Sequence, residues 1–305
     1  MKRATPRGRG SFLVTLLIVG LTAPALAQAV FRARTESVAI STSVKRGNAS
    51  VANLTAADFR LTDNSVAQSI EAVTIESVPL DVTLFMDTSG STAGALDRMK
   101  RNVVSIASLL RPDDQFRLLT IGLAVETPVP WQRAGNRLAL DMKAVPGISL
   151  VYDALFVALT HAPATGRRHL IVAMTDGRDC GSLLDGPRVL DASGRSEAVM
   201  HWIYVSSDGD FDPNAASAWC TPNDAGEEDF LAQSAARTGG DSHRSRFGDP
   251  AVKTFSQILD EFRQSYVLRY SPQGVKSHGW HAVSVQVPAQ PALTIKARSG
   301  YFGAP

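Results

Sequence analysis

Hydrophobic residues in the segment 80–264 follow an alternation of strand and helix patterns. Nearly continuous apolar runs, typical of strands buried on both faces, occur at 80–86 (LDVTLFM) and 169–174 (HLIVAM). Apolar residues spaced three and four apart from Leu96 to Leu110 predict a helix. Further strands are expected at 115–121, 124–130 and 201–207, and further helices at 151–161, 227–238 and 249–264. This alternation predicts an α/β fold, with a doubly wound, mostly parallel sheet covered on both sides.

The segments on either side of this part carry strand patterns. Residues 28–77 contain alternating runs and a strand–turn–strand pattern around Asp63-Asn64. Residues 265–305 contain three alternating runs, at 266–272, 280–288 and 292–302. A three-stranded piece has little core of its own. We therefore expect both flanking regions to pack together as one small β-rich domain, with the α/β domain of residues 78–264 inserted between them.

The first 27 residues have the pattern of an export signal. Four basic residues precede a short apolar run at 12–21, and small residues follow at Ala25 and Ala27. This pattern predicts a secretory signal peptide that is cleaved after Ala27. The alternative, an uncleaved membrane anchor, is disfavoured because the run is shorter than the ~20 residues of a spanning helix. The protein is therefore expected in the periplasm or outside the cell.

Charge and composition narrow the function classes. The chain of 305 residues is 44% hydrophobic and 20% charged, which is ordinary for a globular protein. The first 27 residues hold four of the 31 Lys and Arg and none of the 29 Asp and Glu, so the remainder has a formal net charge of −2. Without a lysine-rich run, nucleic-acid binding is not expected. After Leu21 no apolar run is long enough to cross a membrane.

Oxygen-bearing side chains gather where predicted buried strands end. They are Asp87, Ser89 and Ser91 after the first strand, Ser149 before the helix at 151–161, and Thr175 and Asp176 after the strand at 169–174. Ligands of open parallel sheets bind at the carboxyl ends of strands, so these groups are expected to converge. Hard oxygen donors suit Mg²⁺, Mn²⁺ or Ca²⁺ rather than zinc. Ser89 and Ser91 are also compatible with capping the next helix.

Basic residues are expected close to this cluster. Arg167, Arg168 and Arg178 are placed near the same strand ends, where their charge would balance Asp176 and Asp179.

The motif D-x-S-x-S at 87–91, the hydroxyl at 149 and the T-D-G at 175–177 resemble the von Willebrand factor type A domain with its metal-ion-dependent adhesion site. Longer phrases are similar to the secreted bacterial proteins called VWFA-related. They are LTAADFRLTDNSVAQSIEAV, VPLDVTLFMDTSGS, LVYDAL, YVLRYSP and ALTIKARSGYF. The resemblance covers nearly the whole chain after the signal peptide, in order.

The resemblance implies a role for each site residue. Ser89 and Ser91 would ligate the metal through their hydroxyls, while Asp87 and Asp176 would act from close by, often through water. Ser149 stands where the family usually has threonine, and serine is less restricted at χ1. An open coordination position would attract the carboxylate of a partner.

The function expected from these residues is capture of an acidic residue on a protein ligand by a secreted or periplasmic, Mg²⁺-dependent binding protein. The alternative is a metal-independent structural scaffold of the cell envelope. Enzyme activity is not expected, because the sequence has no G-x-S-x-G elbow, Walker loop or C-x-x-C motif.

The resemblance also concerns the two cysteines. An exported protein meets an oxidising compartment, where an even pair usually forms a disulfide. In the type A domain the strands before Cys180 and Cys220 are neighbours, and both following loops emerge on the metal-bearing face. This implies a Cys180–Cys220 disulfide beside the metal site, and the alternative is two separate buried thiols.

Overall fold

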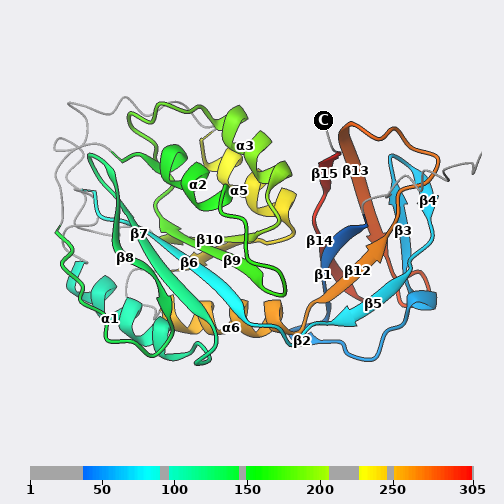
Figure 1. Cartoon of the computed structure of the whole chain (residues 1–305), viewed down its shortest axis with the longest axis horizontal. Helices are drawn as coiled ribbons and strands as arrows, with labels where there is room; N and C mark the ends of the chain where they lie inside the picture. The colour runs from blue at the N-terminus through cyan, green and yellow to red at the C-terminus, as the bar shows by residue number, and fades with distance from the viewer. Residues whose placement is uncertain (1–36, 90–95, 144–148, 206–226, 246–250, 304–305) are drawn as a thin grey trace, which may run out of the picture. The chain divides into compact units, whose positions relative to one another are not determined.

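The computed structural model describes residues 37–89, 96–143, 149–205, 227–245 and 251–303 (Figure 1). The predicted signal peptide, Ser91 and Cys220 lie outside these residues. In the described part of the chain, every helix is too short or too polar to cross a bilayer.

Six strands form the central sheet of the α/β part. In chain order they are β6 (Leu80–Asp87), β7 (Gln115–Ile121), β8 (Val125–Arg133), β9 (Arg168–Thr175), β10 (Val199–Val205) and β11 (Ser242–Ser245). Their order in the sheet is β11-β10-β9-β6-β7-β8. Only β8 runs antiparallel to its neighbour, and the other pairs are parallel. The predicted fold class, a doubly wound and mostly parallel sheet, is confirmed.

Helices cover both faces of this sheet (Figure 1). One face packs against α1 (Leu96–Ser108) and α6 (Ala251–Arg263). The other packs against α2 (Val151–Leu159), α3 (Gly186–Arg195) and α5 (Glu227–Thr238). A sheet covered in this way has only buried positions in its central strands, which explains why the pattern of β6 is continuously apolar rather than alternating.

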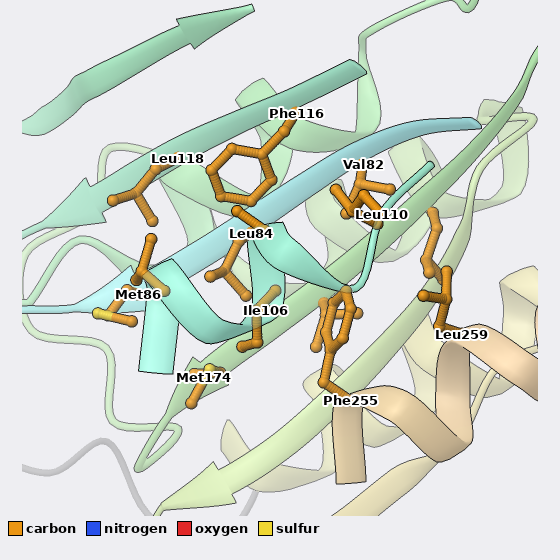
Figure 2. Packing of buried hydrophobic residues seen from close by; sticks show 14 of the residues in the cluster. Val82, Leu84, Met86, Ile106, Leu110, Phe116, Leu118, Met174, Phe255 and Leu259 are labelled. Carbon is orange, nitrogen blue, oxygen red and sulfur yellow. The ribbon is translucent and has the colours of Figure 1, made fainter. Parts of the chain in front are cut away.

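The side chains of β6 divide between the two faces. Figure 2 shows Val82, Leu84 and Met86 directed toward α1 and α6, among residues such as Ile106 and Phe255. Phe85, between them, belongs to the opposite cluster. Successive strand residues point to opposite faces. The side chains of β6 therefore alternate between the hydrophobic clusters on the two faces of the sheet.

The strand order changes direction between β6 and β9. The chain moves outward from β6 through β7 to β8 and then returns to β9, on the other side of β6. The carboxyl ends of β6 and β9 are therefore a topological switch point, where ligands of open α/β sheets bind. Asp87 and Thr175 are the last residues of these two strands.

Two antiparallel sheets combine segments from both sides of the α/β part. The first has β1 (Val38–Arg46), with the short β2 (Ala49–Ser50), β5 (Ala72–Ile75), β12 (Tyr266–Tyr270) and β14 (Thr294–Ala297). The second has β3 (Arg60–Asp63), β4 (Val66–Gln68), β13 (Gly279–Gln286) and β15 (Gly300–Gly303), and a 3-10 turn at Ala56–Asp58 precedes β3. Strand β1 pairs with β12 and β14, and β3 pairs with β13. Residues about 200 positions apart thus share a single core.

A buried carboxylate joins the strands of this core. Asp63 accepts hydrogen bonds from the hydroxyls of Tyr270 and Tyr301, both at 2.9 Å, and lies 2.9 Å from His281 Nδ1. These residues come from β3, β12, β13 and β15, so one polar group ties both sheets together.

Helix α3, strand β11 and the strands β14 and β15 differ from the sequence expectation, which has no strand at 242–245. Helix α3 is not expected from the sequence, because its residues GPRVLDASGR contain two glycines and a proline. A Cβ at Gly194 would lie 2.7 Å from the Trp280 ring, so this glycine permits close packing of α3 against β13. The single run expected at 292–302 is divided into β14 and β15, which belong to different sheets.

The expected placement of Arg167 and Arg168 at the site is wrong. Arg167 precedes β9 and Arg168 is its first residue, so both lie at the amino end of the strand, whereas the predicted site lies at the carboxyl ends. Arg167 Nε donates to Asp81 Oδ1 at 2.5 Å. Arg168 donates to the hydroxyls of Ser41 and Ser265 at 2.9 and 2.7 Å. Both guanidinium groups therefore make their contacts away from the predicted metal site.

Candidate functional site

Asp87 is the last residue of β6 and lies at the switch point between β6 and β9. Its side chain is fully buried, at 0% exposure, which is rare for a carboxylate without bound partners. The Oδ1 atom accepts a hydrogen bond of 2.8 Å from the backbone N–H of Ser89. The Oδ2 atom accepts hydrogen bonds from Ser149 Oγ at 3.1 Å and Thr175 Oγ1 at 2.9 Å. Three segments that are distant in the sequence therefore meet at one carboxylate.

Ser149 reaches this carboxylate because its backbone is held in place. It lies just before α2, and its carbonyl oxygen accepts a hydrogen bond of 2.8 Å from the backbone N–H of Cys180. Cys180 belongs to the loop that follows β9. The structure thus brings together Asp87, Ser89 and Ser149. The loop after β9 holds the backbone of Ser149 through the hydrogen bond from Cys180.

Thr175 and Gly177 shape the end of β9. Thr175 is buried, donates to Asp87, and accepts a hydrogen bond of 3.0 Å from the backbone N–H of Gly177. Gly177 has φ +83°, and a Cβ there would lie 2.8 Å from the Trp202 ring. Both the left-handed backbone and the close aromatic contact favour glycine at this position.

Asp176 places a second carboxylate at the site. It is half-buried, and its Oδ1 accepts a hydrogen bond of 3.1 Å from the backbone N–H of Arg178. Burial, followed by the negative charge of Asp176, raises the pKa of Asp87 to about 6, although hydrogen bonds from Ser89 and Thr175 act in the opposite direction. Both causes disfavour a negative charge on Asp87, so a cation placed nearby would be stabilised.

The donor atoms fit a hard divalent cation. Asp87, Ser89, Ser149, Thr175 and Asp176 offer only carboxylate and hydroxyl oxygens, the ligands of Mg²⁺, Mn²⁺ and Ca²⁺. Ser91, the remaining predicted ligand, lies outside the described residues. Among the residues that are described, no three of His, Cys, Asp and Glu gather as a metal-binding group. The predicted site contains two carboxylates, so hydroxyl oxygens would have to supply the other ligands of a bound cation.

Asp179 was not predicted as a site residue, and the structure gives it a positioning role. Its Oδ1 accepts hydrogen bonds from the backbone N–H of Tyr152 at 3.0 Å and from Ser182 Oγ at 2.5 Å. Tyr152 is in the first turn of α2, whose N-cap residue, Leu150, provides no side-chain cap. Asp179 thus replaces a local cap. Burial raises its pKa, because few water molecules solvate the charge. No local pattern signals this contact, since 27 residues separate it from Tyr152.

A second carboxylate fixes the same loop from α2. Asp153 Oδ2 accepts from the backbone N–H of Leu183 at 3.0 Å, and Oδ1 accepts from that of Leu184 at 3.0 Å. The backbone N–H of Asp153 donates in turn to Ser182 Oγ at 3.2 Å. The loop between β9 and α3 is therefore bound to the start of α2 by hydrogen bonds in both directions.

The cysteine pairing stays a prediction. Cys180 lies in the loop just described, whereas Cys220 is outside the described residues. Within the described part of the chain there is no free cysteine.

Solved structures that match this chain include several von Willebrand factor type A domains. BatB from Bacteroides thetaiotaomicron is 16% identical, with 60% of this chain and 98% of that chain covered and a TM-score of 0.43. A von Willebrand factor type A protein from Catenulispora acidiphila is 11% identical, with coverages of 90% and 65% and a TM-score of 0.42. Proximal thread matrix protein 1 from the mussel byssus, with a zinc-occupied MIDAS motif, is 14% identical, with coverages of 66% and 49% and a TM-score of 0.46.

No family model and no curated protein matches the chain. The chain is similar to von Willebrand factor type A domain structures, and its α/β part has the doubly wound, mostly parallel sheet that the sequence predicted, with a topological switch point at the carboxyl ends of β6 and β9. The narrower resemblance to the VWFA-related proteins stays a prediction.

Proposed function

We propose that this protein is an exported binding module that captures a carboxylate of a partner protein at a divalent cation held beside Asp87. The observation that carries the proposal is the convergence of the Ser149 and Thr175 hydroxyls on the buried Asp87 carboxylate. Such an arrangement costs folding energy, because a charge is desolvated. That cost is offset when a cation of the Mg²⁺ type binds there.

The residues of the site divide the work of binding. Ser89, Ser91 and Ser149 would hold the cation through hydroxyls, and Asp87 and Asp176 would supply negative charge close by. Neutral hydroxyl ligands leave the charge of the cation only partly compensated. A carboxylate from a partner would complete this compensation, which makes an acidic residue the expected feature of the ligand.

The proposed function is binding without catalysis. The side chains that meet at Asp87 in the described residues are hydroxyls and carboxylates. The described histidines with ring contacts lie elsewhere: His161 and His169 beside Trp131, His201 beside His243, and His281 beside Asp63. A general base that is placed against a nucleophile is therefore not part of the proposal.

A second candidate function is a metal-independent scaffold of the cell envelope. One observation favours it: Ser149 and Thr175 both donate their hydroxyl protons to Asp87, so the three groups also satisfy one another without an ion. In that case the hydrogen bonds would have a structural role, and the switch point would bind no ligand.

Two measurements separate these functions. Calorimetric titration with MgCl₂, MnCl₂ and CaCl₂ should show saturable binding to the wild-type protein and none to an Asp87→Ala variant. A pull-down from an envelope extract should retain a partner in Mg²⁺ and release it in EDTA. Absence of divalent-ion binding by the folded wild-type protein would favour the scaffold.

A further inference from the structure

We propose that the contact between His201 and His243 is acid-sensitive, and that its protonation at low pH releases the short strand β11 from the central sheet while the other strands stay paired. His201 lies in β10 and His243 in β11, which are parallel neighbours in the sheet. The two residues are named here the histidine pair. The inference concerns a conformational change away from Asp87, so it does not depend on the proposed function.

The two rings of the histidine pair contact each other directly. His201 Nδ1 lies 3.2 Å from His243 Nε2, and the stacked rings have centroids 5.4 Å apart. His201 is buried, whereas His243 is half-buried. Two ring nitrogens at this distance can share one proton in a hydrogen bond. A proton on each of them would place two positive charges in contact, which opposes the closed arrangement.

Four charged side chains lie close enough to act on the histidine pair. They are Asp241 before β11, Glu261 of α6, Lys45 of β1 and Lys296 of β14. Lys296 forms an ion pair with Asp241, and Lys45 Nζ donates to Glu261 Oε2 at 2.8 Å. Each carboxylate is thus already neutralised by an ammonium group. These ion pairs therefore provide little compensation for two new positive charges on the imidazoles.

Burial is the largest cause that lowers the pKa of both histidines. It lowers the pKa of His201 to about 3, with the neighbouring His243 as the next cause, and it also lowers the pKa of His243. The closed arrangement therefore excludes a proton that an exposed histidine, with a pKa near 6.5, would bind. As the pH falls from about 6.5 toward 3, an arrangement that exposes the rings is stabilised relative to the closed one.

Strand β11 is the element that is most easily released. It has four residues, SHRS, and none of them is apolar, so little hydrophobic free energy holds it against the sheet. Among the described strands it pairs only with β10, whereas β10 is paired with β9 as well. Repulsion within the histidine pair therefore acts on the strand with the fewest other contacts to oppose it.

Release of β11 would change one side of the central sheet. The outer edge of β10 would lose its partner, and unpaired strand edges are templates for pairing with another chain. The ion pair between Asp241 and Lys296, which joins the start of β11 to β14, would be broken. The contact between Lys45 and Glu261 involves β1 and α6 and would remain. The proposed change is thus a local opening and not an unfolding of the domain.

Hydrogen exchange measured by mass spectrometry tests this inference in EDTA, with rates corrected for the intrinsic effect of pH. Protection of residues 242–245 should fall about 30-fold between about pH 7.5 and about pH 5, because opening replaces a histidine pKa of about 3 by one near 6.5. Addition of about 1 M urea at the lower pH should leave this exchange unchanged and accelerate that of β6. A local opening exposes little surface, whereas unfolding exposes much.

The decisive variant carries His201→Asn together with His243→Asn, because asparagine does not titrate. Its residues 242–245 should have equal protection at both pH values. His243→Asn alone, at the half-buried position, replaces the double variant if that protein does not fold, and its loss of protection should be smaller than that of the wild type. The matched control is His278→Asn, at an exposed position just before β13, which should behave as the wild type does.

Three outcomes would contradict the inference. The first is unchanged protection of residues 242–245 in the wild type at about pH 5. The second is a loss of protection that urea accelerates as strongly as it does in β6, since this would be global unfolding. The third is a loss in the histidine variants as large as that in the wild type, since other groups would then cause it.

Discussion

The Ser149 hydroxyl donates a hydrogen bond of 3.1 Å to Asp87 Oδ2, although 62 residues separate the two along the chain. This contact connects the start of α2 with the end of β6. It places Ser149 where the predicted metal ligand must lie, and it suggests a direct test of that role.

Replacement of Ser149 should change metal binding according to the hydroxyl. Ser149→Ala removes an oxygen donor and should weaken Mg²⁺ binding by about 10- to 100-fold, the range seen when supporting groups of metal sites are lost. Ser149→Thr keeps the hydroxyl and restricts its rotamers, so it should bind Mg²⁺ as well as the wild type or slightly better. Calorimetric titration measures both. Equal affinities for the alanine variant and the wild type would show that Ser149 is not a ligand.

Replacement of Asp87 should separate stability from function. Asp87→Asn removes a buried charge that is also repelled by Asp176, so the free energy of unfolding in EDTA at pH 7–8 should rise by about 1 to 2 kcal/mol. Mg²⁺ binding should be lost in the same variant. Urea denaturation and calorimetry measure the two effects.

The control for this prediction is Asp191→Asn. Asp191 lies on the surface of α3 and pairs with Arg195 at 2.9 Å in an exposed ion pair. Exposed ion pairs contribute little, so its stability should change by less than about 0.5 kcal/mol. A destabilised Asp87→Asn variant would mean that the hydrogen bonds from Ser89, Ser149 and Thr175 outweigh the cost of burying the charge.

The sequence predicts the central elements because their patterns are local. The apolar run at 80–86 becomes β6, and the spacing from Leu96 to Leu110 becomes α1. The same patterns locate Asp87 and Thr175 at the carboxyl ends of two parallel strands, and hence on the same side of the sheet. Helix α3 is different, because the packing of Gly194 against Trp280 overrides its poor helix propensity. Its one local signal is the N-cap Asp185 with a proline in the first turn.

The supporting residues of the site are harder to predict. Asp179 and Asp153 act on backbone groups of segments that are distant in sequence, and no spacing rule connects them. Arg167 and Arg168 illustrate the opposite error. Their charge suggests an electrostatic role at the site. Their position at the start of β9, however, places them at the amino ends of the parallel strands, opposite the carboxyl ends that carry the site.

The two cysteines should be joined in the exported protein. Cys180 lies on the loop that supports Ser149, so a Cys180–Cys220 disulfide would restrain the predicted metal-bearing edge. Closure of a loop of this length should stabilise the protein by roughly 4 kcal/mol in the chain-entropy model, less any strain. Alkylation of the unreduced protein followed by mass spectrometry checks the pairing. Two alkylated cysteines would contradict it, and a Cys220→Ser variant gives the stability difference.

Asp179 should support both stability and metal binding. Asp179→Ala leaves the first N–H groups of α2 and the Ser182 hydroxyl without this acceptor, so unfolding should become easier by about 1 to 3 kcal/mol. Mg²⁺ affinity should also fall, because the same loop holds Ser149. Asp179→Asn keeps one acceptor and should recover part of both losses.

The matched control for Asp179 is Asp185→Ala. Asp185 is the N-cap of α3 and accepts from the backbone N–H of Arg188 at 3.1 Å. Its loss should cost about 1 kcal/mol of stability and leave Mg²⁺ affinity unchanged. Equal effects of both variants on Mg²⁺ binding would show that Asp179 acts only through general stability.

His201 should make the folded state sensitive to acid. Its ring is buried against His243, with Nδ1 and Nε2 3.2 Å apart, and burial together with the neighbouring His243 lowers the pKa of His201 to about 3. The unfolded chain has a histidine pKa near 6.5 and therefore binds a proton that the folded protein excludes. The free energy of unfolding should then fall, by up to about 1.4 kcal/mol per pH unit from this residue, as the pH decreases from about 6.5 toward 3.

The matched variant for His201 is His201→Asn, which retains a polar atom for His243 but does not titrate. Urea denaturation at a series of pH values gives the difference in the free energy of unfolding between variant and wild type. Contributions from Asp87 and from other groups that do not contact His201 cancel in this difference, because both proteins contain them. The variant should lose less stability than the wild type below pH 6.5. Parallel curves for the two proteins would mean that His201 binds its proton equally in the folded and unfolded states.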